Sequence, residues 1–461
     1  MIAGNQYVYD ALGNITEIRR AEGSNNLLYA YAYDSQNQLV REDHYDGNGD
    51  QPSNITVSYT YSYDTAGNIL SETKTVYSQT GIASTSGKTY AYGNESWQDL
   101  LTDVNGSPII YEGQTYTNGT VGGNVVSGNP IRYTNGTKTY TDLTWEHGRQ
   151  LTSITTGNKT FTYDYDAEGI RTQKVVDGVV HTYITQNGRV IQESFPYGSS
   201  TVIMIFTYDD QGRPFGFWYS TNGGNSYSQY YYAINAQGDV LGIFFTKKNA
   251  ETNKQETKWM GHYTYDAWGN ILSIEDAIGT TPSSPANLMN RNPLRYRGYY
   301  YDTETGFYYL QSRYYDPANH RFINSDCYTS TGQGYLGHNM FAYCNNAPVL
   351  GIDPWGQWTI SFSISANVTL GVGLLVGIGV SFDDDGNIAV QWNYSIPKNQ
   401  TGSMGIADVG VAGSIHVNRA DTVDDLENVA SALGASIGSG WYGGFDVTSN
   451  TYIADHDAEI D

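Results

Sequence analysis

The chain has 461 residues, among them 42 Tyr and 52 Gly, and a formal net charge of −23 at pH 7. Charged residues make up 15% of it, against about 25% in average globular domains, so uncharged polar side chains must keep much of its surface soluble. The negative charge argues against nucleic acid as a partner of the repeat region, because a polyanion would be repelled and the sequence has no Lys/Arg cluster to offset the repulsion.

A Tyr-x-Tyr-Asp motif recurs between residue 1 and about residue 290. Alternate residues of a strand face the same side, so the two rings of each motif share one face. Asp at the first position of a type I turn and Gly at the fourth are favoured, and Asp64 and Gly67 have this spacing. Ile69 then begins the next strand, so each motif predicts one antiparallel hairpin. The motifs end at Asp10, Asp34, Asp64, Asp166 and Asp266.

The intervals between these motifs are uneven. Asp10 and Asp34 are 24 positions apart, whereas Asp34 and Asp64 are 30 apart. A closed propeller is built from regularly repeated blades. We therefore predict an all-β domain over residues 1–290, in which an antiparallel sheet winds on itself.

Two acidic loops, at residues 46–50 and 383–387, resemble the start of a calcium loop, whose ligands occupy alternate positions. The Glu that closes such a loop at its twelfth position is replaced by Val57 in the first loop and by Tyr394 in the second. The eight His residues show no His-x-x-x-His or His-x-Glu spacing. We interpret both loops as hairpin turns and predict no metal site and no cofactor.

Residues 291–356 are denser in Tyr and Arg than the repeats before them. Five motifs in this segment resemble the Rhs repeat-associated core of bacterial YD-repeat proteins, and the repeats upstream extend the resemblance toward residue 1. The motifs are Arg295 to Asp302 (RYRGYYYD), Tyr314 to Pro317 (YYDP), Arg321 to Ile323 (RFI), Asn339 to Pro348 (NMFAYCNNAP) and Asp353 to Gly356 (DPWG).

This resemblance implies a fold and a function. In the family the repeats form a spiralling β-sheet wound into a hollow shell, the core plugs its end, and a variable C-terminal domain follows the Asp-Pro-x-Gly signature. That domain is frequently a toxin, which the shell encloses until delivery to a neighbouring cell. We therefore expect a secreted or cell-surface protein whose partners are its own C-terminal domain, a cognate immunity protein and the neighbouring cell's surface. We interpret the chain as a fragment, with its export signal in a missing N-terminal part.

The resemblance also implies self-cleavage at the end of the core, which the family attributes to aspartates. The matching positions here are Asp326 and Asp353, with Arg321 as their charge partner, and the cut would fall after Gly356 or Gln357. The chemistry is reasonable, because a carboxylate can act as nucleophile or general base when its partner carboxyl is protonated.

The chain departs from the family's pattern at both signatures. Cys327 stands where cleaving relatives have the Pro of a first Asp-Pro-x-Gly, and Gln357 stands where Leu commonly follows the second. A purely structural interpretation therefore stays open. In it, Asp353 begins a Pro-containing turn that closes the core, and Asp326 forms local hydrogen bonds.

Residues 357–461 have fewer tyrosines and predict a small, β-rich, truncated domain with one helix. Thr359–Ser365 alternates apolar and polar residues, which predicts a strand, and Ile388–Tyr394 predicts the second strand of a hairpin. The helix is expected over Val423–Leu433, capped by Thr422 and ended by Gly434. No catalytic constellation is visible in this region, so no enzyme activity is predicted beyond self-cleavage.

An alternative function is a cell-surface adhesion or carbohydrate-binding protein with the repeats as a stalk. Exposed aromatic rings can stack on the apolar faces of sugars, and the candidates are Trp145, Trp218 and Trp259. Cys327 and Cys344 are compatible with a disulfide or with two unrelated thiols.

Overall fold

The computed structural model describes residues 5–20, 26–47, 54–209, 212–249, 253–327 and 336–356. Seven strands beyond residue 359 are described by their backbone. The described chain is built from antiparallel sheets with one short α-helix, which confirms the all-β prediction. None of its helices has the length and apolar character needed to span a membrane.

The first sheet has nine strands that follow one another in sequence order. Each is antiparallel to the next, so consecutive strands form hairpins. The strands are β1 (Asn5–Tyr9), β2 (Ile15–Arg20), β3 (Leu27–Tyr33), β4 (Leu39–Tyr45), β5 (Ile55–Tyr63), β6 (Ile69–Ser78), β7 (Gly81–Ala91), β8 (Asp103–Val104) and β9 (Ser107–Pro108).

The second sheet has fourteen strands, again in sequence order apart from a separate hairpin formed by β11 (Gln114–Thr117) and β12 (Thr120–Gly123). Its strands are β10 (Ile110–Tyr111), β13 (Pro130–Thr134), β14 (Thr139–Glu146), β15 (Gln150–Thr156), β16 (Lys159–Tyr165), β17 (Arg171–Val176), β18 (Val179–Gln186), β19 (Arg189–Tyr197), β20 (Ser200–Tyr208), β21 (Pro214–Ser220), β22 (Ser228–Ile234), β23 (Val240–Lys248), β24 (Gln255–Tyr265) and β25 (Ile271–Asp276).

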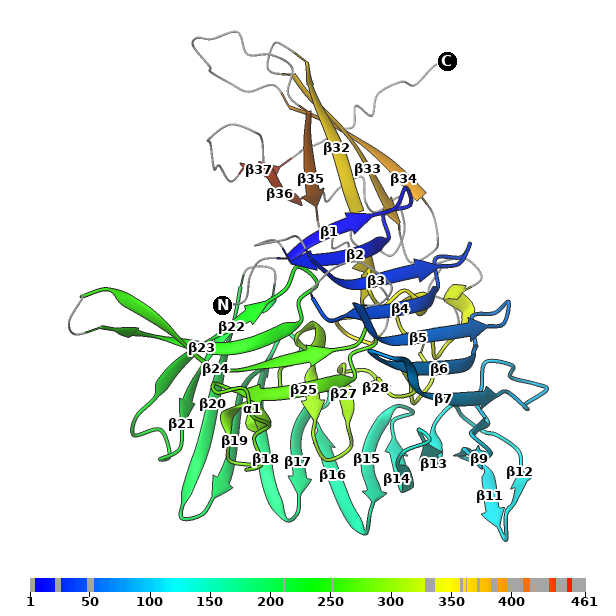
Figure 1. Cartoon of the computed structure of the whole chain (residues 1–461). Helices are drawn as coiled ribbons and strands as arrows, with labels where there is room; N and C mark the ends of the chain where they lie inside the picture. Colours follow the sequence, from blue (N-terminus) through cyan, green and yellow to red (C-terminus); the bar gives the residue numbers. More distant parts are fainter. Residues whose placement is uncertain are drawn as a thin grey trace, which may run out of the picture.

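The second sheet curves back toward the first. In Figure 1 strands β13 to β25 sweep away from the first sheet and bring β22 to β24 toward β1 and β2. Two hydrogen bonds join the sheets there: the Ala267 amide donates to Glu42 Oε1 (2.9 Å), and the Ala236 amide donates to the Tyr7 hydroxyl (3.4 Å). The strip of strands therefore winds on itself, as the uneven spacing of the repeats predicted.

The Asp of each motif holds its turn as expected. Asp64 Oδ1 accepts the backbone N–H groups of Ala66 and Asn68, both at 2.9 Å, and Gly67 has φ +78°. The second Tyr of the motifs after the first, and Tyr92 and Tyr208 at similar positions, add a link that reaches back one repeat, where the hydroxyl donates to a backbone carbonyl. These pairs are Tyr33 to Ile15, Tyr63 to Leu39, Tyr92 to Ile69, Tyr165 to Leu151, Tyr208 to Val190 and Tyr265 to Val240.

Residues 291–356, here called the core segment, lie between the two sheets in Figure 1. The segment follows α1 (Leu288–Arg291) and contains a four-stranded sheet, three short 3₁₀ helices and one further strand. These elements are η2 (Tyr296–Gly298), β26 (Tyr300–Asp302), β27 (Phe307–Tyr309), β28 (Tyr314–Asp316), β29 (Arg321–Phe322), η3 (Leu336–His338), η4 (Cys344–Asn346) and β30 (Gly351–Ile352).

Buried tyrosines fasten the core segment to the turn after β24. Tyr296, Tyr308 and Tyr315 donate their hydroxyls to the backbone carbonyls of residues 267, 269 and 268, at 2.8, 2.8 and 2.7 Å. The Tyr315 ring also stacks on that of Tyr343, with centroids 4.1 Å apart. Buried hydroxyls that all find carbonyl partners fix the segment in one position.

An ion network ties the core segment to β17. Arg171 forms two hydrogen bonds to the Asp302 carboxylate, at 2.6 and 3.0 Å, and Lys174 contacts both Asp302 (2.9 Å) and Glu304 (3.0 Å). All four side chains are almost completely buried. Two cations and two carboxylates balance each other there, which is the condition for burying such groups.

The remaining strands form a short hairpin with β30 and a separate six-stranded sheet, in the order β34-β33-β32-β35-β36-β37. The predicted hairpin exists as the antiparallel pair β33–β34. The strands are β31 (Ile360–Ser361), β32 (Ser363–Leu370), β33 (Leu374–Phe382), β34 (Ile388–Ser395), β35 (Val409–Ser414), β36 (Ser431–Ser436) and β37 (Asp446–Ser449).

The predicted helix over Val423–Leu433 lies outside the described residues as far as residue 430. Its last three residues, from Ser431 to Leu433, belong to β36, so the helix prediction is wrong there. β36 forms backbone hydrogen bonds with β35 on one side and β37 on the other. This pairing on both sides overrides the modest helix propensity of the segment.

Candidate functional site

The structure brings Asp326 and Asp353 together at one guanidinium. Arg313 Nη2 lies 2.8 Å from Asp326 Oδ2 and 3.3 Å from Asp353 Oδ2. Arg313 stands just before β28, Asp326 follows β29 and Asp353 follows β30, so three separate elements of the core segment supply the cluster. All three side chains are nearly inaccessible to solvent, which strengthens the interaction between their charges.

The Arg313 side chain is fixed from several directions. Its guanidinium carbon lies 3.6 Å from the centroid of the Phe322 ring, and Nη1 donates to the Met340 carbonyl at 3.0 Å. The backbone amides of the two acidic residues are also held: that of Asp326 donates to the same Met340 carbonyl, and that of Asp353 to the Tyr299 hydroxyl. The cluster is therefore a rigid arrangement rather than a surface ion pair.

The carbonyl of Gly356 points into this cluster. It accepts hydrogen bonds from Arg313 Nε and from the Ser312 hydroxyl. Gly356 has φ +69°, and a Cβ at this position would lie 2.8 Å from the Leu310 carbonyl oxygen and 3.0 Å from Ser312 Oγ. Only glycine fits there. One guanidinium thus connects both carboxylates to the carbonyl at which the core segment passes into the C-terminal region.

Arg321 does not belong to this cluster, so its predicted role as charge partner is corrected. Its guanidinium donates to the Tyr92 hydroxyl and to the Asp99 carbonyl, both at 2.7 Å, and it lies over the Phe341 ring. Arg321 thus attaches the core segment to the loop between β7 and β8 of the first sheet, and Arg313 takes the predicted role. The sequence signal for Arg313 was weak, because nothing in its spacing relates it to either Asp.

Neither cysteine adds a nucleophile to the site. Cys327 and Cys344 are not joined by a disulfide. Burial, followed by the nearby Asp353 carboxylate, raises the pKa of the Cys344 thiol well above its usual range. Burial and then Asp326 raise the pKa of Cys327 in the same way. Protonated thiols are poor nucleophiles, so the carboxylates are the groups suited to chemistry here.

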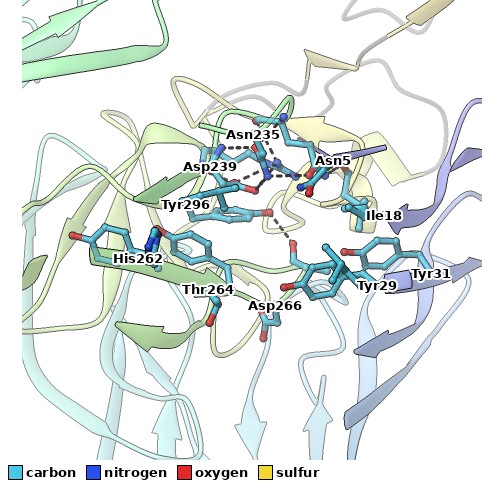
Figure 2. Close-up of a pocket in the computed structure, with 18 residues that line it drawn as sticks. Asn5, Ile18, Tyr29, Tyr31, Asn235, Asp239, His262, Thr264, Asp266 and Tyr296 are labelled. Atoms are coloured by element: carbon cyan, nitrogen blue, oxygen red, sulfur yellow. Dashed lines mark hydrogen bonds and ion pairs between the residues drawn. The ribbon is translucent and has the colours of Figure 1, made fainter. Parts of the chain in front are cut away.

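A hollow of about 250 Å³ lies where the two sheets meet. Figure 2 shows Tyr29 and Tyr31 of β3 on one side, and His262 and Thr264 of β24 on the other. Asp266 stands at its rim; burial and then the nearby Glu42 carboxylate raise the pKa of Asp266 to about 7. The hollow marks the junction between the first and last turns of the wound sheet.

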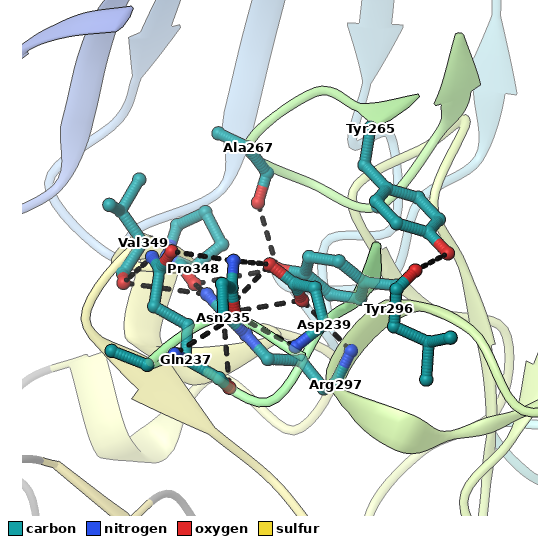
Figure 3. A network of polar contacts seen from close by, with 12 residues as sticks. Asn235, Gln237, Asp239, Tyr265, Ala267, Tyr296, Arg297, Pro348 and Val349 are labelled. Carbon is teal, nitrogen blue, oxygen red and sulfur yellow. Dashed lines mark hydrogen bonds and ion pairs between the residues drawn. The ribbon is translucent and has the colours of Figure 1, made fainter. Parts of the chain in front are cut away.

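Arg297 lines this hollow, and Figure 3 shows the network of polar contacts around it. Its guanidinium contacts the Asp239 carboxylate (3.3 Å) and the Gln237 carbonyl (3.2 Å), and it also donates to the Pro348 carbonyl. Asp239 Oδ1 in turn accepts the Arg297 backbone amide at 2.9 Å. The network locks the core segment to the turn between β22 and β23, which is a structural role.

The remaining candidates from the sequence are the three tryptophans considered for sugar binding and the two acidic loops. Trp145 donates its indole N–H to the Pro130 carbonyl, and Trp259 packs between Phe244 and His262, whereas Trp218 is 40% exposed. Residues 48–50 of the first acidic loop and all of the second (383–387) are not described. Among the described residues, no three His, Cys, Asp or Glu side chains are placed to hold a metal ion.

No family model matches the chain. The chain is 34% identical over 331 residues to the tRNA nuclease WapA of Bacillus subtilis strain 168, which covers 71% of this chain and 12% of WapA. It is 38% identical over 73 residues to the toxin protein Tse5 of Pseudomonas aeruginosa, covering 16% of this chain and 5% of Tse5. These relatives support the resemblance to Rhs-type polymorphic toxins. The chain spans only a small part of either relative.

Solved structures share the fold. The crystal structure of TcdB2-TccC3-TEV matches 76% of this chain and 17% of its own, with a TM-score of 0.53 and 18% identity. The Photorhabdus luminescens Tc holotoxin pore matches 76% of this chain and 16% of its own, with a TM-score of 0.54 and 17% identity. The β-shell fold of the Rhs/Tc toxins is therefore the fold of this chain.

Proposed function

We propose that this chain forms part of the β-shell of an exported Rhs-type toxin, and that its core segment cuts the chain between Gly356 and Gln357. Cleavage would separate the shell from the C-terminal effector region that it encloses and delivers to a neighbouring cell. The observation that carries the proposal is the contact of one buried guanidinium with Asp326, Asp353 and the Gly356 carbonyl.

The arrangement suits hydrolysis with two carboxyl groups. This mechanism requires one carboxyl to be ionised and the other to be protonated, the division of roles known for paired carboxyl groups. The ionised carboxyl takes a proton from water as the water oxygen attacks the Gly356 carbonyl carbon. The protonated carboxyl then gives its proton to the Gln357 nitrogen as the C–N bond breaks. The products are a carboxyl group on Gly356 and a new amino terminus at Gln357.

In this proposal, the shell serves delivery by enclosing the C-terminal region. The sheets wind around the core segment. The ion network at Asp302 holds the segment in place, and so do the hydrogen bonds from its tyrosines to the carbonyls of residues 267–269. The proposed partners are the enclosed C-terminal region, a cognate immunity protein and the surface of a neighbouring cell. A stalk for adhesion or carbohydrate binding needs none of these interior contacts.

Limited proteolysis of the native chain tests enclosure. We expect residues 357–461 to survive digestion by a non-specific protease while the shell is folded, and to be degraded once the shell is unfolded by denaturant. Amino-terminal sequencing of the surviving fragment identifies the cleaved bond, and we expect it to begin at Gln357. Rapid degradation of this region in the folded protein would favour the stalk.

A further inference from the structure

The Gly356 carbonyl has a second donor besides Arg313. The Ser312 hydroxyl oxygen lies 2.7 Å from the Trp355 carbonyl oxygen and within hydrogen-bond distance of the Gly356 carbonyl oxygen. A hydroxyl carries one proton and can donate to only one acceptor at a time. Whether the Ser312 hydroxyl can assist cleavage or only stabilises the local structure depends on which carbonyl receives that proton.

The backbone of Ser312 already serves one of the two acceptors. Its amide lies 2.8 Å from the Leu310 carbonyl and 3.2 Å from the Trp355 carbonyl, so the Trp355 carbonyl shares this donor with Leu310 and does not depend on the hydroxyl alone. The hydroxyl proton is therefore available to Gly356, whose carbonyl also receives Arg313 Nε. Two donors of different kinds then converge on one carbonyl oxygen.

The turn that carries both donors is rigid. The Leu310 amide donates to the Arg313 carbonyl at 3.0 Å, and the Ser312 amide is 2.8 Å from the Leu310 carbonyl. Gln311 between them has φ +63°. Ser312 is buried, and its hydroxyl lies 3.0 Å from where a Cβ of Gly356 would be. Donors fixed before the reaction stabilise a developing negative charge without a cost for reorganisation.

We propose that Ser312 is a catalytic residue, and that its hydroxyl and Arg313 Nε together form the oxyanion site for hydrolysis of the Gly356–Gln357 bond. The inference rests on the proposed self-cleavage. When water adds to the carbonyl carbon, the negative charge of the tetrahedral intermediate develops on the Gly356 oxygen, where both donors point. Ser312 gives up no proton and forms no covalent bond; the carboxyl groups carry the proton transfers described above.

The loss of one oxyanion donor slows acyl transfer by about 100-fold to 1000-fold in enzymes where it has been removed. We expect Ser312→Ala to slow cleavage by about that factor and Ser312→Thr to retain much of the rate, because it keeps the hydroxyl. Ser62→Ala is the matched control, since Ser62 is an exposed residue of β5 far along the chain from the site. It should cleave as the wild type does.

Cell-free synthesis of the full chain with labelled methionine measures these rates without a purified precursor. Samples are quenched in denaturant, and the intact chain is separated from the fragments over time at several pH values. Ser312→Ala should lower the rate at every pH and leave the midpoints of the pH profile unchanged, because the hydroxyl does not titrate. A merely structural serine would instead lower the melting temperature and leave the cleavage rate of the folded protein intact.

The outcomes separate this inference from the one on which it rests. If the wild type cleaves, Asp353→Asn does not, and Ser312→Ala cleaves within twofold of the wild type, Ser312 has no catalytic role and self-cleavage stands. If the wild type itself stays intact, both proposals fail. If Ser312→Ala does not fold, Ser312→Cys takes its place, because a thiol is a weak donor of similar shape. Its folded fraction should cleave as slowly as expected for Ser312→Ala, and cleavage at the wild-type rate would overturn the inference.

Discussion

The Tyr63 hydroxyl donates a 2.6 Å hydrogen bond to the backbone carbonyl of Leu39, which lies one repeat earlier in the chain. Leu39 is fully buried, and its partner in strand pairing is Tyr33, at a register shift between β3 and β4. A side chain thus satisfies a carbonyl where the ladder of backbone bonds is irregular. The second Tyr of the motifs that end at Asp34, Asp64, Asp166 and Asp266 is therefore a link between repeats as well as part of the interior.

Removal of this hydroxyl should weaken the shell. We expect Tyr63→Phe to lower the free energy of unfolding by about 1 to 3 kcal/mol, because the Leu39 carbonyl is left buried without this donor. Tyr197→Phe is the control, since Tyr197 is exposed and its ring contact with Arg291 needs no hydroxyl. Urea denaturation followed by tyrosine fluorescence measures both. An equal effect of the two substitutions would contradict the proposed link.

The buried ion network predicts a larger effect. Asp302→Asn removes the carboxylate that Arg171 and Lys174 share, so it should cost about 3 to 5 kcal/mol of stability. The exposed pair of Lys159 and Asp177 offers a matched substitution, because Asp177→Asn should cost about 0 to 1 kcal/mol. Differential scanning calorimetry compares the two. Similar melting temperatures for both variants would show that the network does not hold the core segment.

Stability should fall as the pH rises from about 4 to 7. Burial and then the Glu42 carboxylate raise the pKa of Asp266 to about 7 in the folded protein. At a pH between the unfolded and the folded pKa of Asp266, the native state binds a proton that the unfolded state does not, so raising the pH lowers the stability. Burial lowers the pKa of His44, but the Glu42 carboxylate outweighs burial and raises the pKa above its usual value of 6.5. The stability from this ion pair is therefore lost only as the pH rises above about 6.5. Lys74, which opposes the protonation of His44, does not change the direction.

Asp266→Asn tests this dependence. Asparagine can hold the same turn, as Asn235 does by accepting the Gln237 and Asp239 amides with its Oδ1. We expect the variant to be more stable than the wild type at pH 8 and to lose part of the slope between pH 4 and 7 in thermal melts. A wild-type melting temperature that rises steadily over this interval would refute the pKa assignment.

The conformation of Gly356 predicts a further effect on cleavage. Gly356→Ala places a Cβ 2.8 Å from the Leu310 carbonyl oxygen and disfavours the left-handed backbone (φ +69°), so the Gly356 carbonyl should move away from its two donors. We expect cleavage to be lost or strongly slowed. Gly279→Ala is the control, because Gly279 has a similar left-handed backbone (φ +78°) but a Cβ there would have no atom within 4 Å. This variant should be cleaved at the wild-type rate. Fragment yields on denaturing gels compare the two variants.

Local patterns in the sequence were enough to predict the repeat region. The Asp64 turn is specified within five residues, and its recurrence indicates hairpins that stack into a wound sheet. The cleavage cluster depends on contacts between separate elements, which no spacing encodes. Asp326 and Asp353 were found through a family motif, whereas Arg313 and Ser312 become visible only when β28 and the end of the core segment are brought together.

Two other predictions failed for the same physical reason. Arg321 was assigned to the cluster because it is near Asp326 in sequence, but its strand directs it toward Tyr92 and the first sheet. The end of the predicted helix, up to Leu433, lies in β36, because neighbouring strands pair with it on both sides. Both outcomes are set by tertiary partners rather than by local sequence.

The intact mass of the purified chain tests the central claim most directly. The wild type, incubated at pH 5 to 8, should convert from 50.9 kDa into two fragments that meet between Gly356 and Gln357. Asp326→Asn and Asp353→Asn should each remain a single chain, because an amide of similar shape cannot serve as carboxylate base or nucleophile. A wild-type chain that keeps its full mass throughout, while folded by circular dichroism, would contradict self-cleavage and leave the core segment as a structural plug.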